Sequence, residues 1–257
     1  MVILVTGSSG FIGKNLVYEL KKFGHEVLEF NRKNNLNKLR LYCENADFVF
    51  HCAGATPGNS TTEEMFDTNV GLTKQLIEFL IDANNTCPIL FTSSIQALHV
   101  TPTGSSAGED KLRTYARTKK MAEDLILDYS KKYNVRTLIY QIPNVFGPGG
   151  IPGKNGVVTT FCHLISRNQE VNVFDENINI HLVYMDDLIN EFVNGIDGVF
   201  NDCDGFCYVR LCSNVKLKTL VTLLKHFNES HVKQMKPELN DVCEENFYKT
   251  FLSYVPR

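Results

Sequence analysis

The chain has 257 residues, 43% of them hydrophobic, which is enough to bury the core of one enzyme-sized unit. Its 26 Lys and Arg nearly balance its 29 Asp and Glu, so the formal net charge of −3 gives no sign of nucleic acid or an anionic membrane as a partner. No segment approaches the roughly 20 apolar residues of a membrane span, and no basic leader precedes the first apolar run, so we expect a cytoplasmic protein.

The N-terminal residues predict a strand, a tight turn and the start of a helix. An apolar run over residues 2–5 leads into Gly7, Gly10 and Gly13, spaced as TGxxGxxG. Glycines in this pattern permit a turn that a Cβ would strain, let the backbone approach phosphates and allow close packing of helix on strand. The helix start would turn its backbone N–H groups and its positive dipole end toward an anion. We therefore predict that a dinucleotide pyrophosphate binds here.

The end of the second expected strand indicates which dinucleotide binds. Enzymes that use NAD commonly place a carboxylate there for the ribose diol, whereas this chain has Asn31, Arg32 and Lys33. An arginine offers a planar fork that pairs with a 2′-phosphate and stacks on adenine. We predict NADP(H) as the cofactor, with Arg32 as a contact. The alternative is a solvated basic turn.

Apolar, strand-like runs alternate with amphipathic segments of helical length, which predicts a parallel sheet with helices on both faces. The expected strands are 1–6, 25–31, 48–52, 88–93 and 137–143. The expected helices are 11–23, 36–44, 65–83 and 115–133, with a terminal pair at 218–227 and 244–254. The fold class is therefore α/β, a Rossmann-type doubly wound parallel sheet with a small C-terminal lobe. We place the dinucleotide-binding domain at 1–150 and the lobe at 151–257, some segments of which return to the core.

The eight cysteines indicate neither disulfides nor a metal site. Several lie in or beside apolar runs, and a chain of this size needs no covalent cross-links. Cys203, Cys207 and Cys212 cluster, but no second Cys or His pair stands at zinc-finger spacing. We expect reduced, mostly buried thiols and no bound metal.

Candidate catalytic residues lie at the end of the fourth strand and at the start of the next long helix. Tyr115 and Lys119 are four residues apart, so a helix places them on one face. A lysine ammonium beside a phenol would lower the pKa of the tyrosine toward neutrality, as proton transfer requires. Ser94 ends a hydroxyl run at the C-terminal end of a strand, where open α/β sheets bind ligands. Taken alone, a solvated helix face is the commoner explanation of such a Tyr/Lys pair.

Seven motifs occur in chain order. They are TGSSGFIG at 6–13, HCAGAT at 51–56, DTNVGLTKQLIE at 67–78, FTSSIQA at 91–97, Tyr115 to Lys119, IPNVFGPGG at 142–150 and VYMDDLI at 183–189. Together they resemble the extended short-chain dehydrogenase/reductase family, whose members act on nucleotide sugars. The resemblance implies that Ser94, Tyr115 and Lys119 form a catalytic triad, and that Tyr115 and Lys119 also contact the cofactor, the lysine at the nicotinamide ribose.

The same resemblance implies a set of further cofactor contacts. They are the backbone of Phe11 and Ile12 for the pyrophosphate, Ala53 and Gly54 for a ribose, Pro143 for the nicotinamide, and Asn69 to hold the helix that carries the lysine.

SSIQA, IPNVFG and the segments 157–173 and 246–256 narrow the resemblance. They are similar to the N-terminal reductase domains of bifunctional capsular polysaccharide enzymes of the UDP-N-acetyl-L-fucosamine pathway, in which a cupin domain follows and epimerises C3. This chain ends at Arg257, where the cupin would begin, so we expect any C3 epimerisation to belong to another polypeptide. The segment 98–113 is longer than in those relatives and is a candidate substrate-covering loop.

The residues after Ser94 indicate the reaction. Related sugar 4,6-dehydratases place an Asp-Glu pair there, and related enzymes that epimerise and reduce GDP-sugars place a cysteine, whereas this chain has Ile95 and Gln96. Hydride and proton transfer at one carbonyl needs only the triad and a nicotinamide. We predict a C4-ketone reductase for a UDP-linked 4-keto-6-deoxy-N-acetylhexosamine. A C4 epimerase with tightly bound NAD would use the same residues, and a third alternative is a non-catalytic nucleotide-binding regulator.

Family placement puts the UDP moiety between the sheet edge and the C-terminal segment. Asn144 would lie near the sugar, and Asn155 and Arg167 are polar candidates for the diphosphate and uridine. The alternative for Arg167 is an exposed cation at a helix end. Helices 65–83 and 115–133 carry apolar residues beyond one face, which suits the four-helix bundle through which this family forms homodimers. We expect a homodimer.

Overall fold

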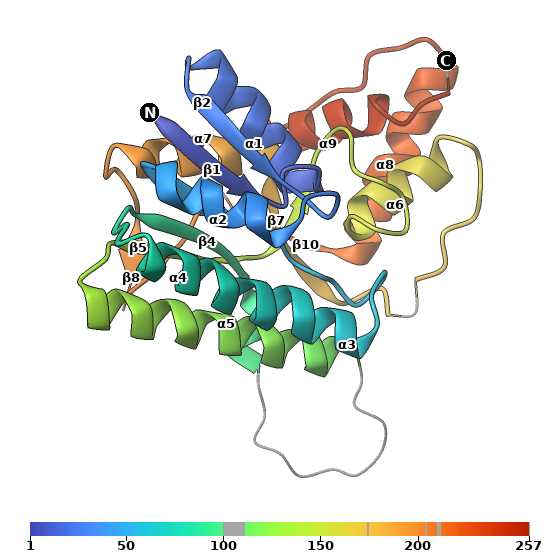
Figure 1. Ribbon diagram of the computed structural model, residues 1–257. Coiled ribbons are helices and arrows are strands. Elements are labelled where there is room, and N and C mark those ends of the chain that lie inside the picture. The colour runs from blue at the N-terminus through green and yellow to red at the C-terminus, as the bar shows by residue number, and fades with distance from the viewer. Residues whose placement is uncertain (100–110, 174, 204, 210–211, 257) are drawn as a thin grey trace, which may run out of the picture. The chain divides into compact units, whose positions relative to one another are not determined.

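The computed structural model describes residues 1–99, 111–173, 175–203, 205–209 and 212–256 (Figure 1). It divides into two compact units, Met1–Ile142 with Ile189–Val209, and Pro143–Leu188 with Arg210–Arg257. The first unit thus ends at Ile142 rather than near residue 150, and it regains a later segment of the chain. Most of the candidate substrate-covering loop, residues 100–110, lies outside the described residues.

A seven-stranded sheet forms the centre of the first unit, in the order β2-β1-β3-β4-β5-β9-β8. Its strands are β1 Val2–Thr6, β2 Glu26–Phe30, β3 Phe48–His51, β4 Ile89–Ser94, β5 Thr137–Ile142, β8 Asp202–Cys203 and β9 Phe206–Cys207. Neighbouring strands in this sheet are parallel, except that β8 runs antiparallel to β9. The predicted Rossmann-type α/β fold is confirmed, because the crossover connections of a parallel sheet place helices on both of its faces.

The helices of the first unit follow the predicted alternation (Figure 1). They are α1 Phe11–Lys22, α2 Leu36–Asn45, α3 Thr62–Met65, α4 Leu72–Asp82, α5 Lys111–Tyr133 and α7 Met185–Ile196, with a π-helical segment Phe66–Gly71 and a 3₁₀ turn Ile95–His99. The first turn of α7, up to Leu188, is assigned to the second unit. α2, α4 and α5 bury apolar side chains such as Leu80 and Ile126 against one face of the sheet. Phe192 of α7 packs on Phe50 and Tyr140. The single helix expected over 65–83 is interrupted by the π-helical segment, a form that often marks functional sites.

The second unit is built on a three-stranded sheet in the order β10-β7-β6. Its elements are β6 Asn144–Phe146, α6 Gly156–Ile165, β7 Asn179–Tyr184, β10 Cys212–Lys216, α8 Leu217–Val232 and α9 Val242–Leu252. Phe146 stacks on Phe247 with ring centroids 4.6 Å apart, and Phe227 packs against Phe251 in the same core. The predicted terminal helix pair corresponds to α8 and α9, with α8 extending further than the expected residue 227.

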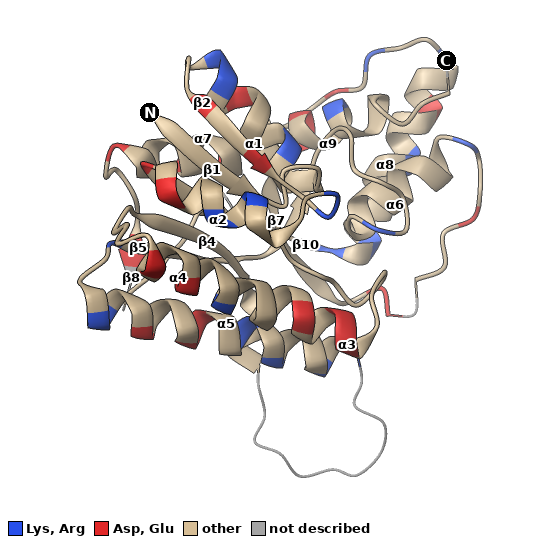
Figure 2. Ribbon diagram, in the orientation of Figure 1, with Lys and Arg blue, Asp and Glu red and all other residues tan. Residues whose placement is uncertain are grey.

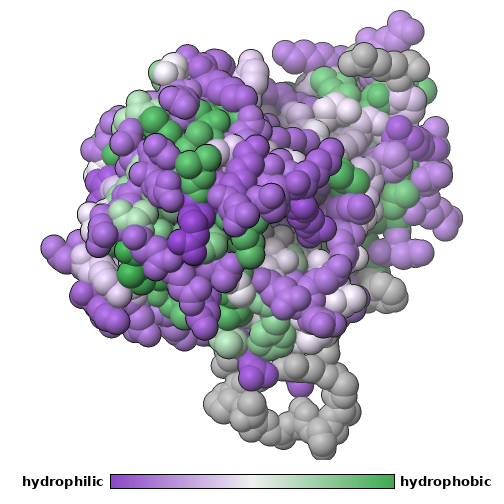
Figure 3. Space-filling view, in the orientation of Figure 1, coloured by the Kyte–Doolittle hydropathy of each residue, from purple (hydrophilic) through white to green (hydrophobic). Residues whose placement is uncertain are grey.

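Figure 2 shows basic and acidic residues interspersed along the helices rather than separated by sign. In Figure 3, hydrophobic residues are scattered among hydrophilic ones on the face shown. Among the described residues, no helix combines the length and the apolar character needed to cross a bilayer. The six cysteines whose side chains the structure describes are all free thiols.

Candidate active site

The glycine turn between β1 and α1 has no room for side chains. Gly7 has a φ of +67°, and a Cβ there would lie 2.7 Å from backbone atoms of Ala53. A Cβ on Gly13 would lie 2.2 Å from the carbonyl oxygen of Gly7, and one on Gly10 would lie 3.1 Å from the same oxygen. α1 begins at Phe11 with no capping side chain and no acidic residue in its first turn. The first N–H groups of a helix have no partner within it, so this turn fits a dinucleotide phosphate.

A compact turn follows β2 and presents Arg32. The N–H of Asn31 donates to Oδ1 of Asn34 (2.9 Å), which closes the turn. The N–H of Ser8 donates to the carbonyl oxygen of Phe30 (3.2 Å), which ties the end of β2 to the glycine turn. Arg32 is exposed on this fixed backbone, and its contact with a 2′-phosphate stays a prediction.

A buried histidine joins β1, β3 and α4 next to the glycine turn. The His51 ring nitrogens share hydrogen bonds with the hydroxyls of Thr6 (2.7 Å) and Thr73 (2.8 Å). The Thr6 hydroxyl also accepts a hydrogen bond from the N–H of Ala53 (3.2 Å). Burial lowers the pKa of His51 to about 3, and the charge of Lys119 adds to this, so the ring is neutral at physiological pH. The histidine therefore fixes the backbone that the sequence predicts to line a cofactor ribose.

Asn69, in the π-helical segment, connects the chain after β3 to α5. Its Oδ1 accepts a hydrogen bond from the N–H of Ala55 (2.7 Å), and its Nδ2 donates to the hydroxyl of Thr118 (2.9 Å). The Thr118 hydroxyl in turn donates to the carbonyl oxygen of Tyr115 (3.0 Å). Asn69 thus contacts the turn of α5 that lies between Tyr115 and Lys119.

The structure brings the three candidate catalytic residues together at the end of β4. The side chains of Ser94 and Tyr115 share a hydrogen bond. Lys119 lies one turn further along α5 and is 3% exposed. Its Nζ donates to the carbonyl oxygen of Thr92 (2.6 Å) and lies 4.3 Å from the centroid of the Phe91 ring.

The electrostatics of Tyr115 differ from the sequence expectation. Burial raises the pKa of Tyr115, and the hydrogen bond with Ser94 offsets this only in part. The expectation that the pKa of Tyr115 lies near neutrality is therefore wrong. The carbonyl of Thr92 holds the lysine, and burial lowers the pKa of Lys119 itself to about 8. Tyr115 is held as a neutral phenol, which is the form that can donate a proton.

A buried carboxylate near these residues was missed by the sequence analysis. Glu123 lies one turn after Lys119 on α5, has no exposed surface and contacts Ser93. A signal for it exists, because residues 115, 119 and 123 follow helical spacing, and 119 and 123 both lie on the buried face of α5. An acidic residue at such a position is almost never fully buried unless it is paired.

The remaining predicted residues lie in the second unit. Asn144 is exposed at the start of β6. Asn155 precedes α6, and its Oδ1 accepts a hydrogen bond from the N–H of Ile151 (2.8 Å). Arg167 follows α6 and donates through Nη1 to the carbonyl oxygen of Tyr254 (2.9 Å). Arg167 therefore has the geometry of a helix-end cation, and nucleotide contacts of these residues stay predictions.

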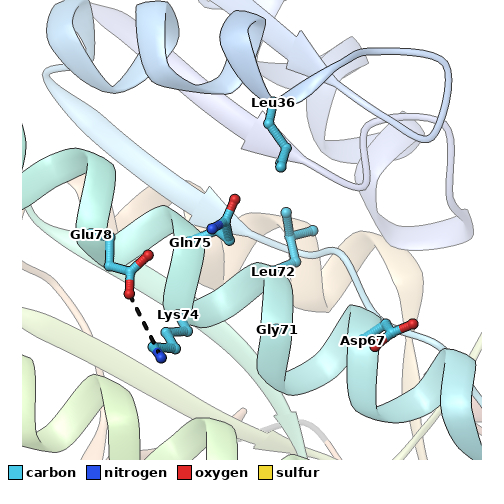
Figure 4. A pocket seen from close by; sticks show the side chains of 7 residues that line it. All are labelled: Leu36, Asp67, Gly71, Leu72, Lys74, Gln75 and Glu78. Atoms are coloured by element: carbon cyan, nitrogen blue, oxygen red, sulfur yellow. Dashed lines mark ion pairs between the residues drawn. The ribbon is translucent and has the colours of Figure 1, made fainter.

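A shallow pocket of about 420 Å³ lies between the start of α2 and α4 (Figure 4). Leu36, Leu72 and Gln75 line it, and Lys74 pairs with Glu78 (3.8 Å) at the same site. None of the predicted site residues contributes to it. Among the described residues, no group of three or more His, Cys, Asp or Glu side chains could hold a metal ion.

Comparison with known proteins decides the family. The model of the NAD dependent epimerase/dehydratase family matches residues 3–194, a range that holds the glycine turn, Ser94, Tyr115 and Lys119. The chain belongs to this family. The predicted membership of the extended short-chain dehydrogenase/reductase class is thereby confirmed.

Individual relatives narrow the comparison. UDP-2-acetamido-2,6-beta-L-arabino-hexul-4-ose reductase of Pseudomonas aeruginosa is 30% identical over 257 residues, which is all of this chain and 65% of the relative. The crystal structure of the capsular polysaccharide assembling protein CapF from Staphylococcus aureus matches with a TM-score of 0.84 and 32% identity, over 100% of this chain and 65% of that one. This chain thus spans 65% of the length of both relatives. UDP-glucose 4-epimerase of Thermotoga maritima matches with a TM-score of 0.79 over 99% of this chain and 98% of that one, but at 19% identity it shows the fold alone.

Proposed function

We propose that the chain is an NADPH-dependent reductase of the C4 ketone of a UDP-linked 4-keto-6-deoxy-N-acetylhexosamine. Its product would serve the biosynthesis of a UDP-6-deoxy-L-hexosamine such as UDP-L-FucNAc or UDP-L-RhaNAc. The observation that carries the proposal is the hydrogen bond between Ser94, at the end of β4, and a half-buried, protonated Tyr115 on α5. The P. aeruginosa relative supports it, because its name describes reduction of a UDP-linked 4-ketosugar of this class.

The residues of the chain perform the proton half of the reaction. When bound, a reduced nicotinamide would supply the hydride for C4. Tyr115 would donate its proton to the oxygen of the same carbonyl, so that the ketone becomes an alcohol. Ser94 would hold that oxygen by a hydrogen bond, and the Lys119 ammonium would stabilise the phenolate left on Tyr115. Ile95 follows Ser94 and has no group that transfers a proton, so chemistry at C5 is not supported.

Consumption of NADPH with a UDP-4-keto-6-deoxy-N-acetylhexosamine tests this proposal. A reductase consumes one NADPH for each alcohol formed. A C4 epimerase would convert a UDP-hexose without added reductant and would purify with NAD bound. A nucleotide-binding regulator would do neither, and either of the last two results would overturn the proposal.

Arg32→Ala is expected to lower kcat/KM for NADPH by at least about tenfold and to leave kcat/KM for NADH nearly unchanged. The physical reason is the loss of a charge-assisted fork to the 2′-phosphate, worth about 1.5–3 kcal/mol. Arg40→Ala is the control, because Arg40 is an exposed arginine that pairs with Asp82 (2.9 Å). A wild-type protein that prefers NADH, or an Arg32→Ala variant with unchanged preference, contradicts the assignment of NADP(H).

The second unit is proposed to bind the UDP moiety, with Asn144 near the sugar. Asn155→Ala and Arg167→Ala are each expected to weaken UDP binding about tenfold in calorimetry, because each removes a hydrogen-bond donor to a nucleotide oxygen. Lys225→Ala, which removes an exposed cation from α8, is the control. Thermal unfolding is measured alongside, since Arg167 also holds the carbonyl of Tyr254. Unchanged UDP affinity in both variants contradicts this placement.

We also propose a homodimer formed through α4 and α5. Met121 and Leu112 of α5 are exposed apolar side chains that such a contact would cover. Light scattering that shows a monomer at micromolar concentration would reject the dimer.

A further inference from the structure

The side chain of Glu123, on α5, is hydrogen-bonded to two central strands of the first unit, β4 and β5. Its Oε1 accepts hydrogen bonds from the hydroxyl of Ser93 (2.5 Å) and from Nε2 of Gln141 (3.1 Å). Ser93 and Gln141 are paired across β4 and β5, so both donors come from one place in the sheet. The carboxylate is thus held near the carboxyl end of β4, where it is bonded to Ser93, the neighbour of Ser94 in the sequence.

The second oxygen of this carboxylate lacks a hydrogen-bond donor and has only a distant counter-charge among the described residues. Oε2 of Glu123 has no hydrogen-bond partner among the described residues. The Nζ of Lys120 is 3.8 Å away, but Lys120 is partly exposed and lies closer to Asp124 (2.7 Å). A buried carboxylate without a full counter-charge costs folding free energy, so packing alone does not account for its presence.

The counterpart of this charge is Lys119, one turn earlier on the same helix. Burial lowers the pKa of Lys119 to about 8, and the charge of Glu123 opposes this fall. Cys52, which directly follows β3, also opposes this fall, and burial raises the pKa of its own thiol to about 12. His51, at the end of β3, is neutral. From β4, Lys119 contacts the carbonyl oxygen of Thr92 and the ring of Phe91, neither of which carries a net charge. Among the described residues, Glu123 is therefore the main source of negative charge acting on this lysine.

We propose that Glu123 is a positioning residue whose buried carboxylate keeps Lys119 as an ammonium ion at the end of α5 that carries Tyr115. The inference rests on the proposed reductase function for its kinetic consequence. For its electrostatic consequence it rests on two buried side chains that lie four residues apart on the same helix. Removing the carboxylate disfavours the charged lysine, so the pKa of Lys119 falls. As pH rises, a step that needs protonated Lys119 then fails at a lower pH than in the wild type.

The charge state of Lys119 is measured without any cofactor or substrate. The pH titration of the lysine side-chain NMR signals, assigned with Lys119→Met, gives its pKa directly. In Glu123→Gln we expect this pKa to fall by about one unit or more, because a nearby opposite charge typically shifts a pKa by about 1–3 units. Asp124→Asn is the matched control: it removes a carboxylate from the neighbouring position of the same helix, but from an exposed side chain, and should leave the pKa of Lys119 unchanged.

A Lys119 pKa in Glu123→Gln that equals that of the wild type would overturn the proposal. If Glu123→Gln does not fold, Glu123→Met removes the same charge with an apolar side chain of similar length, and the same fall is expected or the proposal is wrong. In the pH profile of kcat for ketone reduction, the alkaline apparent pKa should fall together with the pKa of Lys119 in Glu123→Gln. It should stay unchanged in Asp124→Asn. If the pKa of Lys119 falls in Glu123→Gln but the wild-type protein shows no reductase activity, the electrostatic role of Glu123 stands and the proposed function is rejected.

Discussion

Tyr115→Phe is expected to lower kcat for ketone reduction by about 10²- to 10⁴-fold, because it removes the proton donor of the reaction. The ring, its packing and the helix stay in place, so the dissociation constant of NADPH should change little. The hydroxyl that is lost shares a hydrogen bond with Ser94. Burial raises its pKa, so in the wild type it carries the proton that the reaction needs, and phenylalanine has no group to replace it. Stopped-flow absorbance of NADPH measures the reduction, and fluorescence titration measures the affinity.

Tyr129→Phe is the matched control for this substitution. Tyr129 is buried on the same helix, and its hydroxyl donates a hydrogen bond to the carbonyl oxygen of Asn85 (3.2 Å). Its loss should cost about 1 kcal/mol of stability and leave kcat unchanged. A Tyr115→Phe variant with near-normal turnover, or a Tyr129→Phe variant that loses as much activity, contradicts the assigned acid.

The parts of the fold that follow from local pattern were predictable from the sequence. The apolar run before Gly7 and the amphipathic segment after it fix β1, the turn and α1, because the conformational freedom of glycine and helical periodicity act over a few residues. The hydroxyl of Ser94 could likewise be placed at a strand end, and Tyr115 and Lys119 on one helix face. The helix itself begins earlier than expected, at Lys111, so Tyr115 lies in its second turn.

The electrostatics of the site could not be predicted in the same way. The effect of burial on the pKa of Tyr115 depends on which distant elements cover it, and the position of Nζ of Lys119 depends on a carbonyl of β4 that lies 27 residues away in sequence. The hydrogen bond from Ser93 to Glu123 joins residues 30 positions apart in the sequence, and it forms when α5 packs on the sheet. A single sequence reports spacing along one element, whereas desolvation and long-range hydrogen bonds are properties of the assembled layers.

Gly13→Ala is expected to have the largest effect on both stability and cofactor binding. The new Cβ would lie 2.2 Å from the carbonyl oxygen of Gly7 and 3.0 Å from Cα of Ser8, and both are backbone atoms that cannot turn away. The turn or α1 must shift, which costs about 1–3 kcal/mol and lowers Tm by about 2–4 °C for each kcal/mol. The same shift displaces the N–H groups at the start of α1, so NADPH affinity should fall more than tenfold.

Gly71→Ala separates this effect from the general consequences of replacing a glycine. Gly71 has helical backbone angles, and within 4 Å its added Cβ would meet, among the described residues, just the carbonyl oxygen of Phe66 at 3.8 Å, which is an ordinary contact. Alanine in a helix is favoured over glycine by about 0.5–1 kcal/mol, so this variant should keep or slightly raise Tm and keep the NADPH affinity. Differential scanning fluorimetry with and without NADPH compares both variants with the wild type. If Gly13→Ala matched Gly71→Ala in Tm and affinity, the close contact between α1 and the glycine turn would not be what shapes the phosphate site.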